Sequence, residues 1–172
     1  MIDTHEDFRG FAVGVHGAPG VAEACVLLQD RRNLDVNILL LAAFVATVRG
    51  STLTESDVAH ARARVRSWRD DVVVPLRTVR RRLKDGPPPA PNASTAALRA
   101  QVKTVELDAE MIELDELSTV VARLEAPTVS GTAGHRATAA MTVVVGAALD
   151  DEERDAIAVI ASAAARFVED LM

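Results

Sequence analysis

The stretch LQDRRNLDVNILLLAAFVATV, from Leu28 to Val48, decides the fold, because it contains a helix that is apolar on every side. Residues 38–48 are all apolar except Thr47, so no face of this segment is suited to water. A helix of this kind lies at the centre of a bundle and is covered by other helices. Asp35 stands where an N-cap belongs, since its carboxylate can accept from the free N–H groups of the first turn. We therefore predict a central helix over about 36–48, capped by Asp35.

The rest of the chain repeats apolar residues at helical spacing and shows no strand alternation. Two long helices are predicted at 55–84 and 95–124, and Pro75 should kink or split the first of them. Loops are expected at 85–94, which is rich in proline, and at 126–134. The segment 135–172 is expected to be helical and variable, although the valine-rich part up to 149 leaves a strand open. The predicted fold is all-α: one domain, 1–172, forming an irregular bundle of five to seven helices around the central one.

Composition limits the function classes. The chain has 172 residues and a net charge of −6, which argues against a general nucleic-acid binder. A single cysteine, Cys25, excludes a disulfide within the chain and suits a reducing compartment. The first residues, MIDTHEDF, do not resemble a signal peptide, and the apolar run at 38–48 is too short to span a bilayer. We expect a soluble cytoplasmic protein that does not bind membranes.

Charge is segregated between the two long helices. Residues 62–84 contain eight arginines and one lysine against two aspartates, whereas residues 106–116 contain six carboxylates and no basic residue. A short loop joins the two helices, so they are expected to lie antiparallel and to attract each other. Glu106, Glu110 and Glu113 share one face and are the expected partners of the arginines. At 100° per residue, Arg69 falls beside the apolar stripe and Arg77 falls further out.

Sequence motifs for known chemistry are absent. There is no Gly-x-Ser-x-Gly, no phosphate-binding loop and no dinucleotide fingerprint. No Glu-x-x-His occurs, and the four histidines are scattered. Cys25 occupies an apolar helical position, which is typical of a buried inert thiol. No catalytic residue, cofactor or metal is therefore predicted.

Asn37 is the unusual residue of the central segment, because it lies two residues inside a helix that should be buried. A buried amide needs hydrogen-bond partners. Gln29 and Asp30, at the end of the preceding helix, could supply them, and so could Arg69 or Arg77 if the long basic helix crosses here. Two interpretations stay open: a structural polar network at a helix junction, or the floor of a small ligand pocket. An arginine at the edge of an apolar face could also bind a carboxylate or phosphate.

Two blocks of the sequence carry a family resemblance. PGVAEACVLLQDRRNLDVNILLL (Pro19–Leu41), followed by WRDDVVVPLRTVRRRLK (Trp68–Lys84), resembles a mainly proteobacterial family of uncharacterised conserved hypothetical proteins. The resemblance covers about residues 8–124 and implies no activity. Together with the reasoning on Asn37, it leads to one candidate polar cluster: Gln29, Asp30, Asp35, Asn37, Trp68, Arg69 and Arg77.

These observations favour a non-enzymatic helical module that acts through a protein partner or as a homodimer. The grounds are the lack of catalytic motifs and the two apolar stripes on 95–124, one more than a single contact with a neighbouring helix requires. The alternative is a small-molecule or anion-binding protein, or an enzyme, that uses the candidate polar cluster. Nucleic-acid binding through 62–84 is the least favoured interpretation, since few aromatic residues could stack on bases and acidic residues lie nearby.

Overall fold

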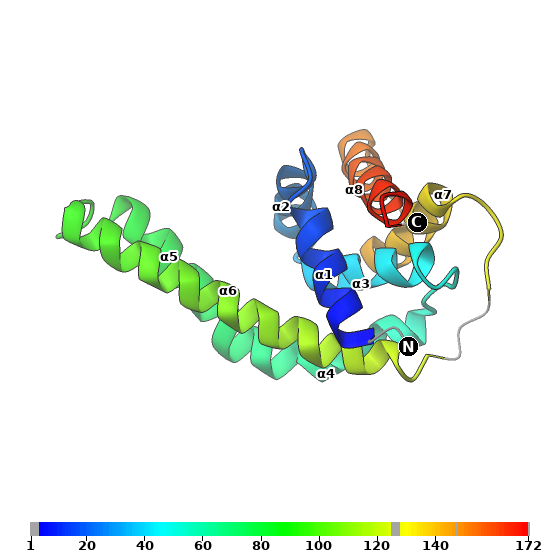
Figure 1. The fold of residues 1–172 in the computed structure, drawn as a ribbon. Coiled ribbons are helices and arrows are strands. Elements are labelled where there is room, and N and C mark those ends of the chain that lie inside the picture. The colour runs from blue at the N-terminus through cyan, green and yellow to red at the C-terminus, as the bar shows by residue number, and fades with distance from the viewer. Residues whose placement is uncertain (1–3, 125–127, 147, 172) are drawn as a thin grey trace.

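The computed structural model describes residues 4–124, 128–146 and 148–171, and in these ranges the fold is all-α (Figure 1). No strand is present in the described residues beyond one isolated bridge between Ser51 and Thr128. If the unbroken rod formed by α4, η1 and α5 is counted once, seven helices are described, which confirms the predicted class and number. The elements are α1 (Thr4–His16), α2 (Val21–Arg32), α3 (Val36–Thr47), α4 (Glu55–Trp68), the π-helical turn η1 (Arg69–Val73), α5 (Val74–Asp85), α6 (Ala93–Val121), α7 (Ala133–Val145) and α8 (Asp151–Glu169).

Helix α3 is the centre of the bundle, as its composition predicts. All its residues from Ile38 to Thr47 are buried, and it contacts α1, α4, α6, α7 and α8. Asp35 is its N-cap: a carboxylate oxygen accepts the backbone N–H of Asn37 at 2.9 Å. The ring of Phe44 packs against Phe8 and Phe11 from α1. The apolar run therefore folds as a core helix, with polar side chains at its N-terminus.

Helix α5 and the first half of α6 form an antiparallel pair that projects from the bundle as an arm (Figure 1). No residue of α5 is fully buried. The second half of α6 lies in the bundle, where Leu114, Leu117 and Val121 are buried. The stripe that carries these residues is thus covered by the chain itself. On the other stripe of α6, Leu98, Val105 and Ile112 are about half exposed.

A π-helical turn precedes Pro75 and explains how the long rod continues through a proline. In this turn the N–H of Val74 donates to the carbonyl of Arg69, five residues earlier. Pro75 has no N–H and its ring would clash with a carbonyl of a regular α-helix, and the wider turn relieves that conflict. The turn adds one residue, so the buried seam passes from Val65 to Val73 rather than to Val72. The irregularity predicted at Pro75 is therefore a local widening within a continuous helix.

Helices α7 and α8 complete the bundle by packing on α3 and on each other, and α8 also packs on α2. The valine-rich segment is helical up to Val145, which settles the choice between helix and strand there. Residues 126 and 127 of the expected loop at 126–134 lie outside the described ranges. Asp150 and Glu153 form a capping box at the start of α8.

No single described helix is both long and apolar enough to cross a bilayer. Phe8–His16 and Val21–Arg32 meet the length and composition criteria only when taken together, and they are bent by 97° relative to each other.

Candidate functional site

A cavity of about 510 Å³ lies beside the N-terminus of α3, enclosed by α1, α2, α3, α6 and the π turn; we call it the central cavity. Its volume falls within the range of small-molecule pockets. Most of its wall is apolar, from Ala12, Val13, Cys25, Val26, Val36, Leu40, Val73, Leu107, Met111 and Leu114. Its polar lining residues are His16, Gln29, Asp35, Asn37, Arg69, Arg77, Glu110 and Glu113.

Asn37 and Glu113 meet at the polar end of the central cavity. The Asn37 side-chain amide donates to Glu113 Oε1 at 3.0 Å, and this bond joins α3 to α6. Glu113 is 1% exposed. Burial, and then the neighbouring Asp35 carboxylate, raise the pKa of Glu113 to about 8. The carboxyl group of Glu113 therefore keeps its proton at neutral pH and can donate it to Asp35, with which it is in hydrogen-bond contact.

Asp35 is held between this carboxyl group and a guanidinium. Its Oδ2 lies 3.6 Å from Nε of Arg69, which makes an ion pair but not a hydrogen bond. Both side chains are mostly buried, with 10% exposure for Asp35 and 19% for Arg69. Oδ2 is a buried oxygen that has no hydrogen-bond partner among the residues that the structure describes. Asn37, Glu113, Asp35 and Arg69 therefore form one chain of contacts across three elements.

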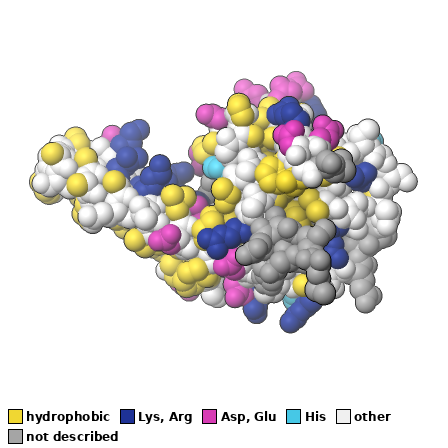
Figure 2. Space-filling model, viewed as in Figure 1, with side chains coloured by type: hydrophobic (Ala, Val, Ile, Leu, Met, Phe, Trp, Pro, Cys, Tyr) yellow, Lys and Arg dark blue, Asp and Glu magenta, His cyan; other side chains and the backbone are white. Residues whose placement is uncertain are grey.

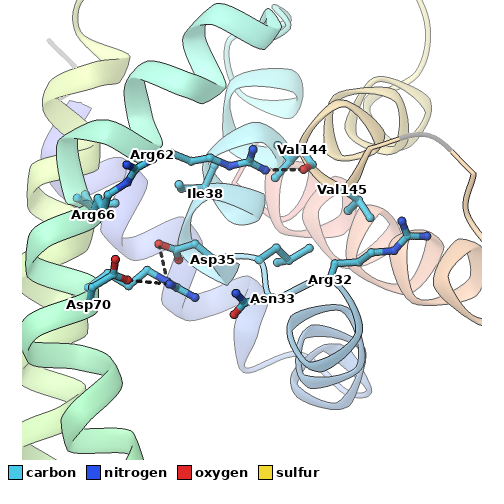
Figure 3. A pocket seen from close by; sticks show the side chains of 12 residues that line it. Arg32, Asn33, Asp35, Ile38, Arg62, Arg66, Asp70, Val144 and Val145 are labelled. Carbon is cyan, nitrogen blue, oxygen red and sulfur yellow. Dashed lines mark hydrogen bonds and ion pairs between the residues drawn. The ribbon is translucent and has the colours of Figure 1, made fainter.

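A second, more polar cavity of about 310 Å³ lies on the other side of the Asp35–Arg69 pair; we call it the arginine cavity (Figure 3). Asp35 and Arg69 line both cavities and form the partition between them. The remaining polar residues of its wall are Arg32, Asn33, Arg62, Arg66 and Asp70. Figure 3 shows Asp35 between α4 and the end of α2, with the Arg62 side chain reaching toward Val144.

Five members of the candidate polar cluster line the central cavity: Gln29, Asp35, Asn37, Arg69 and Arg77. Two do not. Asp30 points to the surface, where it pairs with Arg81 at 3.7 Å and is about half exposed. Trp68 packs against α6, and its indole N–H donates to the carbonyl of Ala109 at 2.9 Å. The structure thus gathers most of the cluster at one place and gives Trp68 a helix-pairing role.

Glu113 is the main residue that sequence reasoning missed in this role. It was expected, with Glu106 and Glu110, to meet the arginines, and instead it is the partner of Asn37. A signal was present, because Glu113 sits between Met111 and Leu114 on the stripe of α6 that turns toward the core. A carboxylate within an apolar stripe indicates a buried group with a specific partner.

The predicted attraction between the basic and acidic helices is confirmed by several ion pairs. Arg77 bridges Glu106 at 3.1 Å and Glu110 at 2.7 Å, and Arg80 also binds Glu106. Burial acts to raise the pKa of Glu106, but the hydrogen bonds from Arg80 and Arg77 outweigh it and lower that pKa. Arg77 was expected to lie away from the seam, and this was wrong: its side chain is 19% exposed, because the extra residue of the π turn rotates everything after it.

Among the described residues, no three or more histidine, cysteine or carboxylate side chains are arranged to hold a metal ion. Cys25 is buried, and burial raises the pKa of its thiol to about 12. The thiol is therefore protonated at physiological pH and serves as an apolar part of the cavity wall.

Comparison with known proteins gives a family match and no match of the other two kinds. No curated protein and no solved structure matches this chain. The model of a family described as "Protein of unknown function (DUF2390)" matches residues 8–117, a span that runs from α1 through most of α6 and holds every described residue of the central cavity. Since this match covers more than half of the chain, the protein belongs to the DUF2390 family.

Proposed function

We propose that this protein binds a small, largely apolar organic molecule in the central cavity. The supporting observation is the combination of an apolar wall with convergent polar groups at one end, one of which has a strongly raised pKa. Polar side chains that served only to join helices would not need a cavity of about 510 Å³ beside them. The ligand would carry a hydroxyl, amide or amine group at the end that meets Asp35, Asn37 and Glu113.

The polar end sets the chemistry that such a ligand must satisfy. Asp35 offers carboxylate oxygens, so it requires a donor. The amide of Asn37 and the protonated carboxyl of Glu113 can each donate as well as accept. A ligand group that both donates and accepts therefore suits this end better than a bare anion or a purely apolar tip. A site that hydrogen-bonds its ligand discriminates strongly against an analogue that lacks the polar group.

The test uses N-phenyl-1-naphthylamine, an apolar dye with one N–H group whose fluorescence rises in apolar surroundings. Val13 and Leu107 line the central cavity and are about half exposed, so they stand at its mouth on α1 and α6. Val13→Trp and Leu107→Trp should each block entry with little effect on folding. Ile112→Trp is the matched control, since Ile112 is equally exposed on α6 and does not line the cavity.

We expect a saturable rise in dye fluorescence with the wild-type chain and with Ile112→Trp, and a much smaller rise with the two mouth variants. Small molecules that displace the dye would then be ranked by their polar group. An absence of saturable binding to the wild-type chain would refute the proposal. Equal binding by all four proteins would refute it too, because the dye would then be sitting elsewhere.

Association with a protein partner or a second copy is a second candidate function, supported by the arm. Val79, Leu98 and Val105 are about half exposed on α5 and α6. Figure 2 shows hydrophobic side chains along the arm and a group of basic ones on its upper side. Light scattering of the purified chain tests self-association: Leu98→Asp should lower the mass of a dimer to that of a monomer. A monomeric wild-type chain at high concentration would exclude the homodimer.

A further inference from the structure

The arginine cavity differs in character from the central cavity. Four arginines line it, from the end of α2 (Arg32), from α4 (Arg62 and Arg66) and from the π turn (Arg69). Asp35 and Asp70 are the only acidic residues of its described wall. Arg32 is neutralised from outside, by Glu153 of α8. The remaining three guanidinium groups face two carboxylates, so the cavity has an excess of one positive charge.

The hydrogen-bonding capacity of Arg62, Arg66 and Arg69 is only partly used by the described residues. Arg62 donates one N–H to the carbonyl of Val144 at 2.8 Å and has no ion pair in the described structure. Within the same described residues, the Arg66 side chain has neither a hydrogen bond nor an ion pair with another residue. Arg69 meets Asp35 at 3.6 Å and Asp70 at 3.2 Å. A guanidinium group has five N–H donors in a planar fork, which fits the oxygens of a carboxylate or phosphate.

We propose that the arginine cavity is an anion site, in which Arg62 and Arg66, with Arg69 at its inner wall, bind a phosphate or carboxylate group. The excess positive charge and the unused donors of Arg66 and Arg62 carry this inference, and it is independent of what fills the central cavity. The sequence pattern pointed to Arg69 and Arg77 for an anion. Arg77 already pairs with Glu106 and Glu110, so the proposed anion ligands are instead the arginines of α4.

The anion has two conceivable sources. It is either a free inorganic ion, or the charged group of an organic molecule whose apolar part occupies the central cavity. The second arrangement would use the fact that the two cavities are neighbours, since they share Asp35 and Arg69 as a wall. A ligand that crosses the wall would separate this pair and would give Arg69 a new anionic partner.

Titration calorimetry tests the site with two probes, inorganic phosphate and 1-naphthyl phosphate. The variants are Arg66→Gln and Arg62→Gln. The matched control is Arg64→Gln, on the same helix, because Arg64 pairs with Glu116 and lines neither cavity. Since charge-assisted hydrogen bonds are the strong ones, we expect each of the two variants to weaken phosphate binding by roughly tenfold or more. The control should bind like the wild-type chain, and unchanged thermal midpoints would show that all variants fold.

The result that overturns the proposal is a wild-type chain that binds neither probe, or binding that Arg64→Gln weakens as much as Arg66→Gln. The Val13→Trp variant identifies the source. If it weakens naphthyl phosphate but not inorganic phosphate, the anion belongs to an organic ligand that spans both cavities. If it affects neither probe, the site takes a free anion. Both of these results support the anion site, and the dye titration reports separately on the central cavity.

Discussion

Replacing Glu113 by glutamine should change how the stability of the protein depends on pH. The folded chain holds the pKa of Glu113 at about 8, against an ordinary value of 4.5. An acid whose pKa is raised by folding is protonated in the folded chain and ionised in the unfolded chain between these two values. The contribution of Glu113 to the unfolding free energy is therefore fully present below about pH 4.5 and falls as the pH rises. Above about pH 8 it no longer changes.

The size of the effect follows from linkage. Each pH unit in this window costs about 1.4 kcal/mol, so the wild-type chain should lose roughly 3 to 4 kcal/mol from this one group between about pH 5 and about pH 8. Glutamine is neutral throughout, nearly the same shape, and keeps an acceptor for Asn37 and a donor toward Asp35. Glu113→Gln should thus remove this loss and be the more stable protein at the higher pH.

Urea unfolding at several pH values measures this pH-dependent loss of stability, with the fluorescence of the single tryptophan, Trp68, as the probe of unfolding. The quantity to compare is the difference in unfolding free energy between variant and wild type at each pH, since contributions from other groups cancel in it. Glu116→Gln is the control, because Glu116 lies on the same helix in an exposed ion pair. Stability curves for Glu113→Gln and wild type that run parallel from pH 5 to pH 8 would refute the reasoning about a buried, protonated Glu113.

Three further substitutions have expected outcomes. Arg77→Ala removes one cationic partner from the buried Glu106 and from Glu110, and should lower the unfolding free energy in urea by about 2–4 kcal/mol. Arg64→Ala, at an exposed ion pair, should lower it by under about 1 kcal/mol. Similar losses for the two variants would contradict the argument from burial. Gly14→Ala would place a Cβ atom in steric conflict with the Phe167 ring of α8 and should lower the thermal midpoint. Gly10→Ala on the same helix meets open space and should raise the midpoint slightly. The opposite order would show that α8 can move away from α1 at little cost. Asn37→Leu removes the bond to Glu113 and should cost about 1–2 kcal/mol, and an unchanged midpoint with loss of dye binding would assign Asn37 to the ligand rather than to the fold.

Sequence reasoning was sufficient where one helix carries the whole signal. The apolar run at 38–48, interrupted only by Thr47, indicated a core helix, and Asp35 before it could be identified as its cap from local chemistry. The segregated charges of two helices joined by a short loop likewise predicted that these helices attract each other, and the ion pairs of Arg77 and Arg80 with Glu106 confirm it. In these cases the deciding interactions are either local or follow from the chain connectivity.

Sequence reasoning failed where a single extra residue changes the geometry. Pro75 announced an irregularity, but a kink, a break and a π turn are all compatible with a proline. Only the last of these advances the helix by one residue, which makes Val73 rather than Val72 the buried position and brings Arg77 inward. The partner of Asn37 was missed for another reason: Glu113 lies 76 positions away, and its contact depends on which stripe of α6 enters the bundle.

The π turn also fixes how the arm is aimed. In an α-helix each residue turns the chain by about 100°, so α5 keeps its orientation about its own axis only while the stretch 69–73 keeps its length. Deleting Asp71 would remove the extra residue of the turn and rotate α5 about its own axis by roughly a quarter of a turn, which would carry Arg77 away from Glu106. An alanine inserted in the loop at the tip, between α5 and α6, would leave this orientation unchanged. The protein should therefore accept changes in chain length at the far end of the arm and reject them at its base.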